Sequence, residues 1–143
     1  MTYLVATDGS AVSDLAIEHA ARDASAHGAA ISLVHVLEPR AEIVDGELVL
    51  PGGAKAAERG EDLLAEGARL AEETAAEHDG GLAIETELRG GSPADAIAAH
   101  AGEVGAERIY VGHRGEAADR DPRVGSVAKA IVDKASVPVV VVK

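Results

Sequence analysis

Apolar residues gather in five short runs along the chain, and longer stretches with helical spacing separate these runs. The runs cover residues 3–6, 30–37, 82–88, 108–111 and 137–142. Short apolar runs bounded by glycine, proline or polar turns are typical of buried strands. Strands that alternate with helices predict βαβ units, with a parallel sheet covered on both faces. The pattern therefore predicts an α/β fold: one doubly wound domain over residues 1–143, with helices on both faces of the sheet.

The helical stretches begin and end at residues that commonly cap helices. Ser10 and Gly28 bound the first, residues 54–79 form the second, Ser92 opens the third, and residues 126–135 form the fourth. The expected buried positions are Val12, Leu15, Ala16, His19 and Ala20 in the first helix, and Leu63, Gly67, Leu70 and Thr74 in the second. Residues 82–88 alternate apolar and polar, which predicts an edge strand. In segment 38–54, Asp45-Gly46 between two apolar pieces fits either a hairpin or an irregular surface excursion.

The stretch after the fourth run has the composition of a phosphate-binding loop. Gly112 ends the apolar run, Gly115 follows, a polar segment 116–124 comes next, and Gly125-Ser126 open the last helix. Glycines allow a backbone to approach an anion closely, and the N–H groups and dipole of a helix start favour negative charge. A tight turn before a serine-capped helix is the alternative, because the chain holds 16 glycines. Neither the Walker A pattern nor the Rossmann fingerprint is present.

The spacing G-x2-G-x9-G-[ST], filled by Gly112, Gly115, Gly125 and Ser126, resembles the ATP-binding signature of the universal stress protein family. Further segments resemble that family in the same order along almost the whole chain: V-A-T-D-G-S at 5–10, L-V-H-V at 33–36, G-S-P-A-D-A-I at 91–97 and S-V-P-V-V-V-V at 136–142. The resemblance implies a five-stranded parallel sheet of order 3-2-1-4-5, with the switch in strand order between the first and fourth strands. Ligands of such folds bind at the carboxyl ends of the strands beside that switch.

The resemblance also implies which residues hold ATP, or another adenine nucleotide, together with Mg²⁺. By this resemblance, the turn of Ala6, Thr7 and Asp8 contacts ribose and adenine. The Val36 backbone binds the adenine edge, and Val111 lies under the base or ribose. The phosphates lie against Gly112, His113, Arg114, Gly115, Gly125, Ser126 and Val127. Asp8 is either a Mg²⁺ and ligand contact or a turn residue bonded to its own backbone. His113 departs from the family, which usually carries Ser or Thr there.

The composition narrows the classes of function. There is no cysteine, so disulfide and thiolate chemistry are excluded. The net charge is −12, which disfavours binding to nucleic acid and to anionic membranes. The chain start lacks a basic region before its first apolar run, and the apolar runs are far shorter than the ~20 residues of a membrane span. A cytoplasmic location is expected.

Three functions fit these residues. The first is a non-enzymatic ATP-binding stress protein with an unidentified protein partner, which forms a homodimer through the last strand, Val137 to Val142. That apolar strand is expected at a sheet edge, where unpaired backbone groups accept another strand. The second is a slow ATP hydrolase, although no catalytic constellation stands out in the sequence. The third is a nucleotide-free interaction module on the same fold.

The acidic, lysine-poor and aromatic-poor composition resembles that of proteins from a high-salt cytoplasm. If the acidic surface is such an adaptation, low salt should destabilise the fold, because unscreened carboxylates repel one another. We expect the free energy of unfolding, measured by denaturant titration, to rise with salt. A stability maximum below ~0.2 M salt would count against this adaptation.

Overall fold

The computed structural model describes residues 1–38, 42–49, 54–78, 81–114 and 124–143. In chain order the elements are β1 (Thr2–Ala6), α1 (Ala11–His27), β2 (Ala30–Leu37), β3 (Glu42–Val44), β4 (Glu47–Val49), α2 (Ala54–Ala76), β5 (Ile84–Gly90), α3 (Pro93–Val104), β6 (Arg108–Gly112), α4 (Ser126–Lys134) and β7 (Val139–Val142). Among the described helices, none combines the length and the apolar character needed to cross a membrane.

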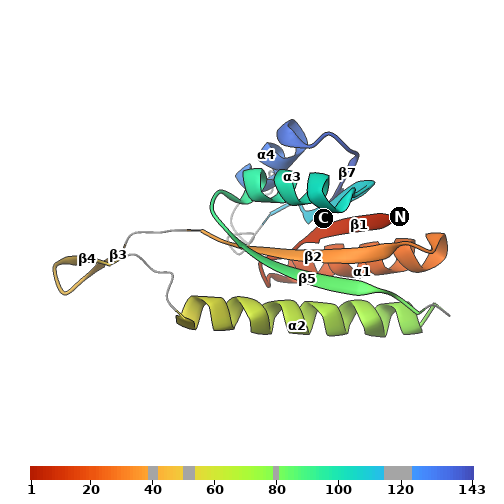
Figure 1. Ribbon diagram of the computed structural model, residues 1–143, viewed down its shortest axis with the longest axis horizontal. Helices are drawn as coiled ribbons and strands as arrows, with labels where there is room; N and C mark the ends of the chain where they lie inside the picture. The colour runs from red at the N-terminus through yellow and green to blue at the C-terminus, as the bar shows by residue number, and fades with distance from the viewer. Residues whose placement is uncertain (39–41, 50–53, 79–80, 115–123) are drawn as a thin grey trace.

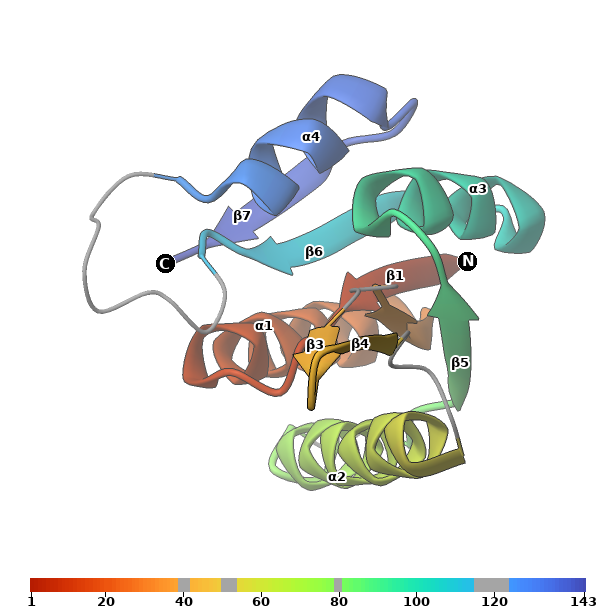
Figure 2. The same ribbon diagram turned by 90° about the vertical axis from the view of Figure 1, so that its left-hand side faces the viewer.

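Five parallel strands form the central sheet in the order β5-β2-β1-β6-β7. Counted within the sheet alone, this order is 3-2-1-4-5, so the predicted fold class is confirmed. Helices α1 and α2 cover one face of the sheet, and α3 and α4 cover the other (Figures 1 and 2). Because all five strands are parallel, their carboxyl ends lie along one edge of the sheet. We call this edge, from Gly90 of β5 to Val142 of β7, the carboxyl rim.

Each face of the sheet has its own core, built mainly from Val, Leu, Ile and Ala. The core under α1 and α2 includes Val5, Ile17, Leu33 and Leu64; the core under α3 and α4 includes Leu4, Val34, Ile97, Ile109 and Ile131. Successive residues of β1 and β2 point into opposite cores, as the period of a strand requires. Both faces of these central strands are therefore buried, which explains their nearly continuous apolar sequences.

The buried faces of α1 and α2 differ in part from the faces that the sequence predicts. On α1 the buried side chains include Ala16, Ile17, Ala20, Ala21 and Ala24, whereas Leu15 is 41% exposed and His19 is also exposed. On α2 the buried positions are centred on Leu64, Gly67 and Ala71, with Leu63 and Leu70 only half-buried. The prediction is confirmed at Ala16, Ala20, Gly67 and Thr74 and is wrong at Leu15 and His19, because Ile17, Ala21 and Ala24 face the sheet in their place. A Cβ built on Gly67 would lie 2.8 Å from Leu33 Cδ2.

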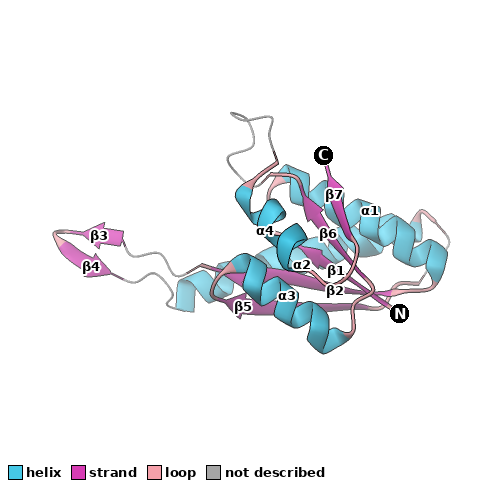
Figure 3. Ribbon diagram, turned by 90° about the horizontal axis from the view of Figure 1, so that it is seen from above, coloured by secondary structure: helices cyan, strands magenta, loops and turns pink. Residues whose placement is uncertain are grey.

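Segment 42–49 forms the hairpin that the Asp45-Gly46 pair suggested. Strands β3 and β4 pair antiparallel, and Asp45 and Gly46 have φ angles of 52° and 80°. Two successive positive φ angles are the geometry of a type I′ turn, which Asp-Gly favours. The hairpin projects away from the central sheet at the end where α2 begins (Figures 1 and 3).

The two tyrosines of the chain join β1, β6 and α1. The rings of Tyr3 and Tyr110 lie 5.8 Å apart, and the Tyr110 hydroxyl donates to Asp23 Oδ2 at 2.5 Å. Arg108 completes the group, with its guanidinium 4.9 Å from the centre of the Tyr3 ring. Burial, together with the hydrogen bond to Asp23, raises the pKa of Tyr110 from 10.0 to about 12.

The raised pKa of Tyr110 predicts a loss of stability in base. The folded protein binds the Tyr110 hydroxyl proton more tightly than the unfolded chain does. The protonated hydroxyl therefore adds to the free energy of unfolding below pH 10, and this contribution is lost as the pH rises from 10 to about 12. We expect Tyr110→Phe to flatten the decrease in the free energy of unfolding across this window. Denaturant titrations at a series of pH values measure it. A folded wild type whose phenolate absorbance is complete near pH 10 would contradict the assignment.

Candidate functional site

A backbone hydrogen bond brings the two halves of the glycine motif together. The Gly125 N–H, at the start of α4, donates to the carbonyl oxygen of His113 at 2.6 Å. Gly125 has a φ of −67°, so it does not need the left-handed region. An added Cβ would lie 3.4 Å from both Arg114 Cα and the His113 oxygen, which is ordinary van der Waals contact, so the backbone here does not itself require a glycine. The end of β6 and the start of α4 thus form one continuous surface at the carboxyl rim.

Gly112 packs β6 against the start of α1. A Cβ built on Gly112 would lie 2.7 Å from Val12 Cγ1 and 3.2 Å from the carbonyl carbon of Val12. This contact places the turn between β1 and α1 beside the glycine motif. The sequence pattern assigned Val12 to the helix face and gave no sign of its contact with Gly112.

Thr7 is hydrogen-bonded to two neighbouring elements, β2 and α1, at the carboxyl rim. Its N–H donates to Val34 O of β2 at 2.9 Å, and its carbonyl oxygen lies 2.8 Å from His35 Nδ1. Its hydroxyl lies 3.1 Å from Ser13 Oγ on α1 and accepts from the Gly9 N–H at 3.2 Å. Since a carbonyl oxygen only accepts, His35 Nδ1 carries the proton in this contact. His35 and Ser13 therefore position the turn, a role that the sequence analysis did not assign to either.

Asp8 has the turn geometry that was one of its two expected roles. Its Oδ1 accepts from the Ser10 N–H at 2.9 Å, while Ser10 Oγ accepts from the Ser13 N–H at 3.2 Å and caps α1. Burial, and then the nearby Glu18, Asp8 and Glu66 carboxylates, raise the pKa of Asp14 above its ordinary value. The turn is therefore an acidic side of the rim.

The chemistry of this turn suits a divalent cation that arrives bound to phosphate. Carboxylate oxygen is a preferred ligand of Mg²⁺, which is commonly bound through one or two carboxylates plus substrate phosphates. Within the described ranges, no group of three or more His, Cys, Asp or Glu side chains is placed to hold a metal ion. Asp8 is the carboxylate that this turn could offer to such an ion.

His113 is buried at the end of β6, with 7% of its surface exposed. Its N–H donates to Val142 O at 2.8 Å, and its ring Nδ1 lies 3.3 Å from the same oxygen. Arg114 Nε donates to His113 Nε2 at 2.7 Å. A carbonyl only accepts and a guanidinium only donates, so the ring is the neutral tautomer with its proton on Nδ1.

The remaining predicted site residues lie around this rim. Ala6 and Val111 are buried at the ends of β1 and β6, and Val36 is half-buried near the end of β2. Ser126 and Val127 are exposed in the first turn of α4, where N–H groups have no partner within the helix. Gly115 and the charged residues Glu116, Asp119, Arg120, Asp121 and Arg123 lie outside the described residues.

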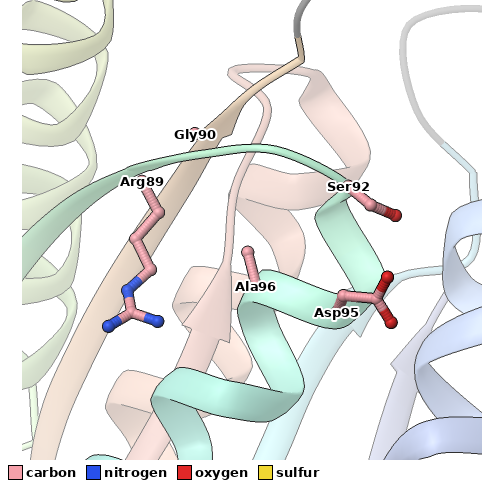
Figure 4. A pocket seen from close by; sticks show the side chains of 5 residues that line it. All are labelled: Arg89, Gly90, Ser92, Asp95 and Ala96. Atoms are coloured by element: carbon pink, nitrogen blue, oxygen red, sulfur yellow. The ribbon is translucent and has the colours of Figure 1, made fainter.

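A cavity of about 400 Å³ lies at the other side of the rim, where β5 meets α3 (Figure 4). Arg89, Ser92 and Asp95 are among its lining residues. Ser92 and Asp95 point to the same side of α3, and Arg89 points away from them (Figure 4). Arg89 pairs with Glu103, and Asp95 pairs with Lys134. The charged side chains that line this cavity are thus paired with other residues of the chain, and they do not point toward a common centre.

A serine, a histidine and a glutamate lie in line between β2 and α3. Ser32 Oγ is 2.9 Å from His100 Nε2, and His100 Nδ1 is 3.5 Å from Glu103 Oε2. Hydrolases use such an order of groups around an accessible hydroxyl. Here Ser32 is 3% and His100 6% exposed, so the group fastens α3 to the sheet and cannot receive a substrate.

The profile of the universal stress protein family matches residues 1–143. This chain belongs to that family. It is 35% identical over 142 residues to a universal stress protein from Mycolicibacterium smegmatis, which aligns with 97% of this chain. This chain covers 47% of that relative, about half its length.

Solved universal stress proteins share the whole fold. One from Archaeoglobus fulgidus, in complex with dAMP, superposes with a TM-score of 0.76 at 25% identity, covering 100% of this chain and 98% of its own. Another, in complex with cAMP, has a TM-score of 0.73 at 25% identity and covers 100% of this chain and 96% of its own. These relatives carry adenine nucleotides on the same fold.

The packing of Gly112 predicts that this strand end tolerates no side chain. We expect Gly112→Val to lower the free energy of unfolding by about 1–3 kcal/mol, because its Cβ would overlap Val12. Gly90→Val is the matched control, since Gly90 ends β5 on the same rim and its Cβ would meet only Leu37 O at 3.8 Å. The control should stay within about 0.5 kcal/mol of wild type in denaturant titrations. Equal losses in the two variants would show that the Val12 contact is not the cause.

Proposed function

We propose that this universal stress protein binds an adenine nucleotide, ATP with Mg²⁺, at the carboxyl rim between β1 and β6. The bond between Gly125 N and His113 O carries the proposal, since it joins the glycine-bearing strand end to a helix start beside the Thr7–Asp8 turn. The phosphates would lie on the α4 amides and the ribose and base over the β1 turn, toward Val36. The relatives bound to dAMP and cAMP support the adenine part of the ligand.

The electrostatics of the rim favour an anion on the α4 side. The helix dipole directs positive potential at the first turn, where Ser126 and Val127 are exposed. Arg114 is a cationic residue whose Cα lies 3.4 Å from an ideal Gly125 Cβ, just before this turn, and Lys129 is exposed further along the helix. In a protein with a net charge of −12, such a local concentration of donors is what an anionic ligand needs.

The second part of the proposal is a regulatory homodimer that pairs through β7. This strand ends the sheet beside β6 and consists of four valines, Val139–Val142. Its outer backbone groups face away from β6, which is the arrangement that strand addition uses. Val132 of the neighbouring α4 is 50% exposed and would add apolar surface to the contact. A second copy related by a two-fold axis would present the same strand antiparallel.

The first experiment is to denature the purified protein, identify any released nucleotide by chromatography, and titrate the stripped protein with ATP and Mg²⁺ in high salt. We expect released adenine nucleotide or micromolar affinity. Parallel titrations with AMP and cAMP identify the preferred form, and a turnover assay with wild type and Arg114→Ala tests slow hydrolysis. Absence of both released nucleotide and binding would refute the proposal and favour the nucleotide-free interaction module.

A valine at Gly125 tests the location of the site. The backbone there accommodates a Cβ at 3.4 Å, so the fold should survive while the isopropyl group blocks the approach of phosphate. We expect Gly125→Val to weaken ATP binding about 100-fold or more, equivalent to about 2.7 kcal/mol. Gly102→Val is the control, because this exposed α3 glycine has no atom within 4 Å of its ideal Cβ. Unchanged binding by Gly125→Val would place the site elsewhere.

A further inference from the structure

His113 connects the glycine motif to the last strand through both its backbone and its ring. Its N–H and its ring Nδ1 reach the same Val142 oxygen, at 2.8 and 3.3 Å. Its carbonyl accepts from Gly125 at the start of α4, and its ring Nε2 accepts from Arg114 in the loop. One buried residue therefore contacts the loop, the helix start and the end of β7.

The two ring nitrogens of His113 bind different partners, Val142 through Nδ1 and Arg114 through Nε2. Nδ1–H is directed at β7, and the lone pair of Nε2 holds the Arg114 guanidinium, because each partner can play only one hydrogen-bonding role. A serine or threonine at this position would have a single hydroxyl and could not span from Val142 to Arg114.

We propose that His113 is a positioning residue that couples the nucleotide site to self-association through β7. This inference rests on the proposed function, both the nucleotide and the pairing of a second copy. A ligand that draws Arg114 toward its phosphates moves the hydrogen-bond partner of Nε2, and the ring carries this change to the carbonyl of the edge strand. Coupling between two binding events is reciprocal, so nucleotide and second copy change one another's affinity by the same factor.

Two substitutions separate the two sides of the ring. His113→Asn keeps an amide donor near the place of Nδ1 and provides nothing for Arg114. His113→Gln extends an amide oxygen toward the place of Nε2, where it can accept from Arg114, and removes the donor to Val142. Each variant therefore retains one half of the link, and circular dichroism verifies that both are folded.

The test measures the dimer dissociation constant by analytical ultracentrifugation, with and without ATP and Mg²⁺, and the ATP dissociation constant by calorimetry. In the wild type we expect ATP to shift the dimer constant about fivefold or more, the lower end of common coupling strengths. The readout in both variants is this shift, a ratio that does not require the ATP affinity or the dimer constant itself to stay at the wild-type value. In both variants the dimer dissociation constant should be about the same with and without ATP.

The outcomes distinguish this inference from the function on which it rests. A wild type that binds no nucleotide, or that stays monomeric, refutes the proposed function and the coupling with it. A wild type that binds ATP and dimerises with the same constant in both conditions overturns the coupling alone. Variants that weaken both constants yet keep the wild-type shift would give His113 a purely structural role, which also overturns the inference.

Discussion

The constraint on which this structure depends is the parallel pairing of all five strands of the central sheet. Because the strands are parallel, all of them run in the same direction and every carboxyl end emerges at one rim. Each connection between neighbouring strands must therefore cross over the sheet. The turn after β1 and the end of β6 meet there although they lie about a hundred residues apart in the sequence. A candidate binding surface at the switch in strand order is a geometric consequence of that topology.

The core uses small side chains to draw the layers together. The chain has no Phe or Trp, so apolar volume comes from Val, Leu, Ile and Ala. Alanines on α1 and glycines on α2 allow the helices to approach the sheet closely, as the 2.8 Å distance from an ideal Gly67 Cβ to Leu33 shows. Protein interiors are close-packed, so such small residues are as constrained as large ones. A small residue has the same use at the rim, where the absence of a side chain on Gly112 leaves room for Val12.

Polar residues at the rim form hydrogen bonds with one another. Thr7, Ser13 and His35 fix the turn after β1, and His113 fixes the end of β6 against β7 and α4. Hydrogen bonds of this kind pre-form a surface, and a pre-formed surface loses less entropy when a ligand binds. The turn after β1 and the end of β6 are thus held in place by hydrogen bonds within the chain. These supporting residues distinguish the site from a set of flexible turns.

The sequence by itself determined the alternation of strands and helices, the type I′ hairpin at Asp45-Gly46 and the helix starts at Ser10 and Ser92, because each depends on local periodicity or turn chemistry. It also pointed to Gly112, Gly125 and Asp8 as neighbours of one rim, because strand ends in an α/β sheet follow from chain direction. Only the tertiary structure decided that Ile17 and Leu64 are buried while Leu15 is exposed, since the rotation of a helix about its axis depends on how it packs against the sheet. It alone revealed Val12, Ser13 and His35 as supports of the rim. The direction of the His113 ring, toward Val142 and Arg114, likewise depends on atoms brought together from separate parts of the chain, which no local pattern encodes.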